Sequence, residues 1–300
     1  MQTNTAVVIG ENRRDLEEYG TFFFPVAAYE TCLRKTPLGF YDAHWHNRLH
    51  IMYPAAGSSI RVTTETAQHD LHDEDAVFLS EGVLHSVYPL PGRESTFIIL
   101  LFDKKVISGF PGSGIERDLI LPFSSFQEIV LRKTNEAHAE ILRHIQNGFA
   151  ALQTADAVHE LVFCTEAMTM WAMCHTQGLL RTKQTNPLSD LGSERAKAML
   201  SFLCKNFSSD LKLEEITIAA NISRSQGSSL FKNYVGKTIF EYLLHYRIEK
   251  SIELLVQTDR TISYIAYETG FSSASHYIDR FKQIIGMSPG EYRKKHAAGT

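Results

Sequence analysis

The chain has 300 residues, of which 44% are apolar, and a formal net charge of −4. This is enough material for one large domain or two ordinary ones with real hydrophobic cores. No apolar run approaches the length of a membrane span, no signal peptide is evident, and the four cysteines form no C-x-x-C pair. We therefore expect a cytoplasmic protein with reduced thiols and no membrane partner.

The charge is unevenly distributed along the chain. From Leu191 onward there are 15 of the 30 Lys and Arg residues and 11 of the 34 Asp and Glu residues, which leaves 15 basic against 23 acidic residues before it. The back of the chain is therefore basic and the front acidic. This split favours two domains with different partners, of which the basic one could face phosphate.

The front of the chain is expected to be β structure. Residues 1–20 are interpreted as a polar N-terminal arm. From Phe22 to about Phe102, short runs rich in β-branched and aromatic residues are broken by Gly, Pro, Ser and Asp. Such short, closely spaced strands predict a small sandwich or barrel, which we assign to residues 21–115.

Four histidines stand out in this region. His44 and His46 are two residues apart, a spacing that places both on one side of a strand. His50 follows four residues later, and His85 lies on a later predicted strand. The pattern resembles the motif of cupin barrels, in which a glutamate usually stands at the position that His50 takes here.

Three interpretations of the histidines are open. Four neutral imidazoles would suit zinc, iron, nickel or copper. They could instead pack and hydrogen-bond as ordinary buried side chains. We favour the third interpretation, a pocket for an organic effector with no metal and no cofactor, lined by His44, His46, His50, Tyr53, Arg61, His85 and Tyr88.

From about Thr134 the apolar period becomes helical, with Ile141, Ile145 and Phe149 on one face. The helix that follows is apolar on nearly all sides and needs burial on more than one face. We assign residues 116–177 to a helical segment that docks on the β domain or forms a homodimer. Residues 178–193 are polar and turn-rich, and we expect them to be a linker.

The last part of the chain, residues 194–300, contains two copies of one element. Residues 213–223 are matched 49 positions later, and residues 231–242 are matched 50 positions later. Each copy predicts a short amphipathic helix, a turn and a second helix. Ser223 and Ser272 are the expected N-caps of the second helices, and Gly270 suits a turn position with positive φ.

Helix, turn and helix make up the helix-turn-helix unit, whose second helix enters the DNA major groove. An ordinary helical domain with polar faces is the alternative, but two matched units in a basic domain favour DNA binding. Short polar side chains suit base edges, and cationic ones suit phosphates. The expected DNA-contacting residues are Arg224, Ser225, Gln226, Ser228, Ser229, Lys232, Ser273, Ala274, Ser275, His276, Asp279, Arg280 and Lys282.

The stretch GFSSASHYIDRFKQIIGMSPGEYR, Gly270–Arg293, resembles the signature of the AraC/XylS family of bacterial transcription regulators, and the resemblance covers roughly Leu191–Lys295. It implies two helix-turn-helix units joined by one long helix, here Thr238–Gln257, that sets the reading helices in successive major grooves. Cupin-like barrels also form the sensor domain of many members. Two departures from the family pattern are expected to weaken the DNA binding of the first helix-turn-helix unit. Gly227 lies inside its reading helix, where glycine costs about 1 kcal/mol of helix stability relative to Ala, and Ser229 stands where arginine is common.

The sequence thus predicts a multidomain α+β protein: an N-terminal cupin-like β-barrel with a helical docking segment, and a C-terminal all-α domain with two helix-turn-helix units. We expect a transcription regulator in which a small effector, for example a sugar, changes how the DNA domains sit on promoter half-sites. The expected partners are promoter DNA, the effector and a second copy, with RNA polymerase as a further candidate.

No enzyme activity is expected, since the sequence has no P-loop, no dinucleotide-binding fingerprint and no nucleophile elbow. The alternative is a metal-dependent cupin enzyme, a dioxygenase or isomerase, that the helical domain merely tethers.

Overall fold

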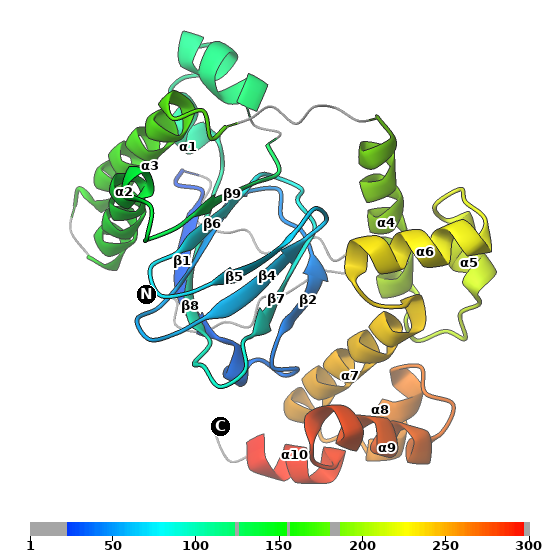
Figure 1. The fold of residues 1–300 in the computed structure, drawn as a ribbon. Helices are drawn as coiled ribbons and strands as arrows, with labels where there is room; N and C mark the ends of the chain where they lie inside the picture. The colour runs from blue at the N-terminus through cyan, green and yellow to red at the C-terminus, as the bar shows by residue number, and fades with distance from the viewer. Residues whose placement is uncertain (1–22, 124–125, 155–156, 181–186, 297–300) are drawn as a thin grey trace. The chain divides into compact units, whose positions relative to one another are not determined.

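Figure 1 shows a computed structural model of the chain, which describes residues 23–123, 126–154, 157–180 and 187–296. Main-chain contacts divide the chain into two compact units, the first built mainly on Tyr41–Pro187 and the second from Leu188 onward. The strands of the described residues all lie in the first unit, and the second is helical. The predicted order, a β-rich domain followed by a helical domain, is confirmed.

The first unit contains two antiparallel sheets. The five-stranded sheet has the order β1 (Val26–Cys32), β8 (Thr96–Phe102), β3 (Leu49–Pro54), β6 (Ala76–Leu79) and β9 (Glu128–Leu131). The four-stranded sheet has the order β2 (Tyr41–His44), β7 (His85–Pro89), β4 (Ile60–Thr64) and β5 (Gln68–Leu71). Apolar side chains of both sheets form one buried cluster, including Met52, Val62, Leu79, Val87, Phe97 and Leu101.

Two long helices, α2 (Glu136–Gln153) and α3 (His159–Thr176), pack on the other face of the five-stranded sheet. Side chains alternate along β3, so that Met52 points between the sheets while Ile51 points toward the helices. The residues that Ile51 meets there include Ile145 and Phe163. The apolar sides of both helices are therefore buried against the sheet within one chain.

Two predicted boundaries differ from the structure. The segment 116–177 is not wholly helical, because β9 forms within it and pairs with β6, Val130 opposite Val77. Short helical turns at α1 (Lys105–Ser108), Ile115–Ile120 and Leu121–Phe123 precede that strand. The helix α4 (Pro187–Lys205) begins inside the predicted linker 178–193, which fits the tolerance of the first helical turn for proline.

The second unit contains the predicted duplication. The first copy consists of α5 (Leu213–Ile218) and α6 (Arg224–Val235), and the second of α8 (Ile262–Glu268) and α9 (Ala274–Ile285). The long helix α7 (Ile239–Gln257) joins them, and α10 (Pro289–His296) follows. Because α6 and α9 begin and end at equivalent positions of the two copies, the repeat seen in the sequence is a repeat of structure. Among the described helices, none has both the length and the apolar composition needed to cross a bilayer.

The extra residue of the second copy lies in its turn. Asn221 and Gly270 occupy equivalent positions of the two copies, and both have positive φ, 53° and 85°. The N-caps follow them: Ser223 Oγ accepts a hydrogen bond from Gln226 N, and Ser273 Oγ accepts one from His276 N. The prediction of Ser272 as a cap was therefore wrong by one residue, because the insertion falls between Gly270 and the cap.

Gly227 has a packing role that the sequence did not reveal. It is buried where α6 crosses α5, and a Cβ at this position would lie 2.4 Å from Thr217 Cγ2. In the second copy the pair is reversed in size: Tyr277 takes the place of Gly227, Ala266 that of Thr217, and both are fully buried. Gly227 is thus required for the approach of the two helices, and this packing role opposes the gain in helix propensity that alanine would bring.

We expect Gly227→Ala to destabilise the second unit by about 1–2 kcal/mol, because overpacking outweighs the gain of about 1 kcal/mol in helix propensity. Adding Thr217→Ser removes the clashing methyl group, keeps the hydroxyl that donates to the Glu214 carbonyl, and should restore most of the stability. Urea unfolding of the two single variants and the double variant measures this coupling.

The matched control is Gly290→Ala, since Gly290 lies in α10 and a Cβ added to it would meet nothing within 4 Å. It should be neutral or slightly stabilising. An unfolding free energy of Gly227→Ala equal to that of the wild type would show that α6 and α5 can separate without cost, and would contradict the packing argument.

Candidate DNA-binding surface and histidine cluster

The second helix of each helix-turn-helix unit presents its polar residues to solvent and its apolar residues to the core. Phe231 of α6 and Tyr277 and Phe281 of α9 are fully buried. The exposed residues among those predicted to contact DNA are Arg224, Ser225, Gln226, Ser228, Ser229, Lys232, Ser275, His276, Asp279, Arg280 and Lys282, while Ser273 and Ala274 are half-buried. The predicted DNA-binding surface is therefore exposed in both helix-turn-helix units.

Two of the predicted residues have a structural task in the helix start. Gln226 Oε1 accepts hydrogen bonds from Ser223 N at 3.3 Å and from Ser223 Oγ at 3.1 Å, which completes a capping box. Ser273 Oγ caps α9 by accepting a hydrogen bond from His276 N at 3.2 Å, without a reciprocal bond from the His276 side chain. Paired hydrogen bonds from Gln226 to a base would require this cap to open, so these two side chains are less suited to reading bases than the sequence suggested.

The two arginines of the surface, Arg224 and Arg280, contact exposed neighbours. The Arg224 guanidinium contacts Glu214 of α5, with both side chains at least half exposed. Arg280 donates to His276 Nε2 at 3.3 Å and to Gln283 Oε1 at 2.9 Å on the open face of α9. Exposed pairs of this kind contribute little to stability. Both guanidinium groups can therefore exchange these partners for phosphate or a base edge.

Two arginines outside the predicted DNA-contacting set hold other segments of the second unit against α7. Arg247, in the middle of α7, donates to the Phe207 carbonyl at 2.7 Å and to the Ser209 carbonyl at 2.8 Å. A Cβ on Gly270 would lie 2.7 Å from the same Phe207 carbonyl oxygen. The turn of the second helix-turn-helix copy therefore packs against the Phe207–Ser209 segment. Near the C-terminal end of α7, Arg293 of α10 donates to the Leu255 carbonyl at 3.2 Å.

The first unit holds a histidine cluster, defined as His44, His46, His50 and His85. His44 ends β2 and stands opposite His85 of β7, while His50 belongs to β3 of the other sheet. His46 lies beyond the end of β2, not on the strand as its spacing suggested. All four side chains are almost completely buried.

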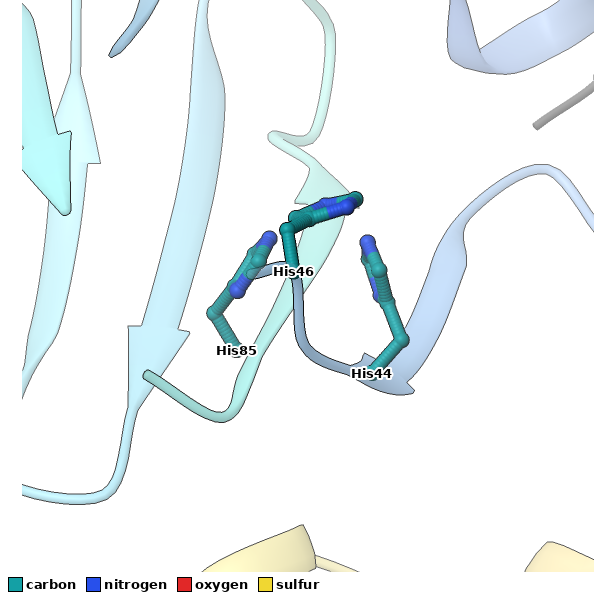
Figure 2. Close-up of side chains that lie close together, drawn as sticks. All are labelled: His44, His46 and His85. Atoms are coloured by element: carbon teal, nitrogen blue, oxygen red, sulfur yellow. The ribbon is translucent and has the colours of Figure 1, made fainter. Parts of the chain in front are cut away.

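The rings of the cluster face one another, as Figure 2 shows for three of them. One ring nitrogen each of His44, His46 and His85 lies within 4.8 Å of the others. The ring centroid of His50 is 4.8 Å from that of His46 and 5.0 Å from that of His85. The sequence therefore correctly predicted that four histidines from separate segments converge.

Main-chain carbonyls fix two of the rings. His44 Nδ1 donates to the Asp42 carbonyl at 2.7 Å, and His85 Nδ1 donates to the Val83 carbonyl at 2.9 Å, since a carbonyl can only accept. In the neutral form of each ring, Nε2 is then the acceptor atom. Within the described part of the chain, His85 Nε2 and both ring nitrogens of His50 have no hydrogen-bond partner.

Burial also keeps two rings of the cluster, those of His50 and His85, uncharged. Desolvation, followed by the neighbouring histidines, holds the pKa of His50 well below its usual value. Desolvation likewise lowers the pKa of His85 to about 3. These rings are consequently neutral at neutral pH, the form in which imidazole accepts a proton or binds a metal.

The other three residues of the predicted effector pocket lie elsewhere. Tyr53 points to the helices, where its ring meets that of Phe149 at 6.2 Å. Arg61 forms a bidentate ion pair with Asp70. Tyr88 of β7 stands opposite Arg61 of β4 in the register of the sheet. The physical reason is the alternation of side chains, since Tyr53 and Tyr88 are each three residues from a cluster histidine and so face the other side.

Comparison with known proteins gives the same assignment for the second unit. A family model described as a helix-turn-helix domain matches residues 216–295. The HTH-type transcriptional regulator YdeC of Bacillus subtilis is 25% identical, covering 97% of this chain and 99% of its own. A putative AraC-like transcription regulator of Streptomyces antibioticus is 34% identical, covering 36% of this chain and 35% of its own.

Among solved structures, an apo ToxT variant from Vibrio cholerae covers 93% of this chain and 100% of its own, at 14% identity and a TM-score of 0.46. The duplicated helix-turn-helix units and the matching sequences define a DNA-binding regulator of transcription. The second unit is similar in sequence to AraC-like transcription regulators.

We expect Arg280→Ala to weaken DNA binding by about 1–3 kcal/mol if the guanidinium reaches a base edge, and mainly to reduce the salt dependence by about one unit of slope if it contacts phosphate. Affinity measured at several salt concentrations separates the two. Arg143→Ala is the matched control, because Arg143 is an equally exposed arginine on α2 of the first unit. If Arg280→Ala changes neither quantity, α9 does not lie in the groove as placed.

Proposed function

We propose that the protein is an effector-responsive regulator that holds promoter DNA by α6 and α9 in successive major grooves. The observation that carries the proposal is the pair of equivalent helices, each polar on its open face and each attached to α7. In helix-turn-helix proteins the second helix reads base edges, while contacts to phosphate set the register. The targets would be double-stranded DNA with two recognition elements about one helical turn apart.

The first unit is the proposed sensor. It has a separate core between its sheets, a polar cluster within that core, and helices on one sheet face. The start of α3 also exposes Val158, Leu161 and Val162, a set that would suit contact with a second copy. An effector that binds two arrangements of the first unit with different affinity would shift the equilibrium between them, and with it the placement of the DNA-binding units on half-sites.

The proposal is tested by sequencing the DNA fragments that the purified full-length protein retains, with and without added sugars and small organic acids. We expect enrichment of paired elements and a change in their recovery with one class of additive. The additive should also raise the unfolding temperature of the first unit. Retention without sequence preference would contradict the regulator, and an unchanged pattern with every additive would contradict control by an organic effector.

The rigid spacing is tested on the enriched DNA itself. Inserting 5 base pairs between the two elements moves one of them to the opposite face of the duplex, so binding should fall as far as it does when one element is deleted. Inserting 10 base pairs returns both elements to one face of the duplex but leaves them farther apart. This DNA is the second substrate of the test. Unchanged affinity with the 5-base-pair insert would mean that the two units bind independently.

A further inference from the structure

We propose that the histidine cluster binds a divalent transition-metal ion between the two sheets of the first unit, with His44, His46, His50 and His85 as its ligands. This goes beyond the proposed function, because it concerns the first unit alone and does not require DNA. The sequence had favoured an organic pocket, but the three polar residues expected to complete that pocket face away from the cluster.

The first argument is convergence. Imidazoles from β2, β7, β3 and the segment after β2 meet in a buried site, and ring nitrogens of three of them lie within 4.8 Å of one another. Ligand nitrogens about 2.0–2.1 Å from one ion lie at most about 4.2 Å apart. Small inward rotations of the rings are therefore sufficient to place these nitrogens around a single ion.

The second argument is orientation. A metal-binding histidine usually donates its other ring N–H to a carbonyl or carboxylate, which fixes the tautomer and directs the lone pair at the ion. His44 and His85 have this arrangement through the carbonyls of Asp42 and Val83. Two rings in the cluster are thus already prepared with Nε2 as the ligand atom.

The third argument is the cost of leaving the site without a ligand. His50 is 2% exposed, and neither of its ring nitrogens has a hydrogen-bond partner among the described residues. A buried polar atom without a partner destabilises the folded state. An ion bound by one ring nitrogen would remove part of that cost, and buried water is the competing explanation.

The donor set decides the class of metal. Four neutral nitrogen donors without a carboxylate suit Zn²⁺, Co²⁺, Ni²⁺, Fe²⁺ or Cu²⁺, whereas Mg²⁺ and Ca²⁺ prefer oxygen ligands. An ion held this way would link the four-stranded sheet, through His44 and His85, to the five-stranded sheet, through His50. Its binding should therefore stabilise the first unit.

The experiment uses the full-length chain, purified without a histidine tag and treated with a chelator. We expect Zn²⁺ or Co²⁺ to bind at one ion per chain, to raise the unfolding temperature, and, for Co²⁺, to develop visible absorption bands of a nitrogen-ligated ion. His50→Gln and His85→Gln should each lower the affinity at least tenfold. His296→Gln, which removes an exposed histidine of the second unit, should leave it unchanged.

Direct metal analysis of the wild-type protein keeps the test decisive if a variant fails to fold. No uptake of Zn²⁺, Co²⁺ or Ni²⁺ at micromolar concentration would overturn the proposal and leave buried water as the explanation. Binding that both glutamine variants retain at full strength would overturn it as well, because the ion would then lie elsewhere. Neither result bears on DNA binding, which is measured separately.

Discussion

The geometry of the DNA-binding unit depends on how α7 is held. The helix spans 19 residues, or roughly 28 Å at 1.5 Å per residue, which is comparable to one turn of the DNA duplex, about 34–36 Å. A helix of this length can set the distance between two readers only if each reader is fixed to it. Arg247 holds the Phe207–Ser209 segment against α7 through two main-chain carbonyls, and Arg293 holds α10 near the C-terminal end of α7.

Charge-assisted hydrogen bonds to carbonyls are well suited to this task. The Phe207–Ser209 segment follows the end of α4 and lies outside any helix, so its main-chain carbonyls need partners from elsewhere. Arg247 satisfies two of these carbonyls, and Gly270 lets the turn of the second copy approach the same segment. Any side chain at Gly270 would push against backbone, which cannot move aside as a side chain can. The turn of the second helix-turn-helix unit and the segment between α4 and α5 thus meet at one point of α7.

The sequence predicted the elements that follow from local rules. Periodicity, N-cap serines and the constant offset between the two copies identified α5 through α9, because each depends on residues near one another in the chain. The missed features depend on contacts between distant segments. Arg247 carries no local signal, and the need for glycine at position 227 arises only when α5 packs on α6. The cap at Ser273 was missed because the position of the insertion within the turn was not recognised.

In the first unit, the histidines could likewise be predicted from local spacing, whereas the rest of the expected pocket could not. Convergence of His44, His50 and His85 followed from their strand positions, whereas His46 lies beyond the end of β2. Applying the two-residue period consistently would also have excluded Tyr53 and Tyr88, which are each an odd number of residues from a cluster histidine. The register of the strands and the pairing of Arg61 with Asp70 required the sheet itself.

The central strand of the larger sheet connects the cluster to the helices. β3 has two neighbours on each side in the order of that sheet, and its side chains alternate between the two cores. His50 faces the space between the sheets, while Ile51, the next residue, lines a cavity beneath α2 and α3 together with Phe163. Because packed interiors transmit displacement, a ligand that moves His50 must also shift the contacts of Ile51. A displacement at His50 can therefore reach α2 and α3, the helices that pack on the five-stranded sheet.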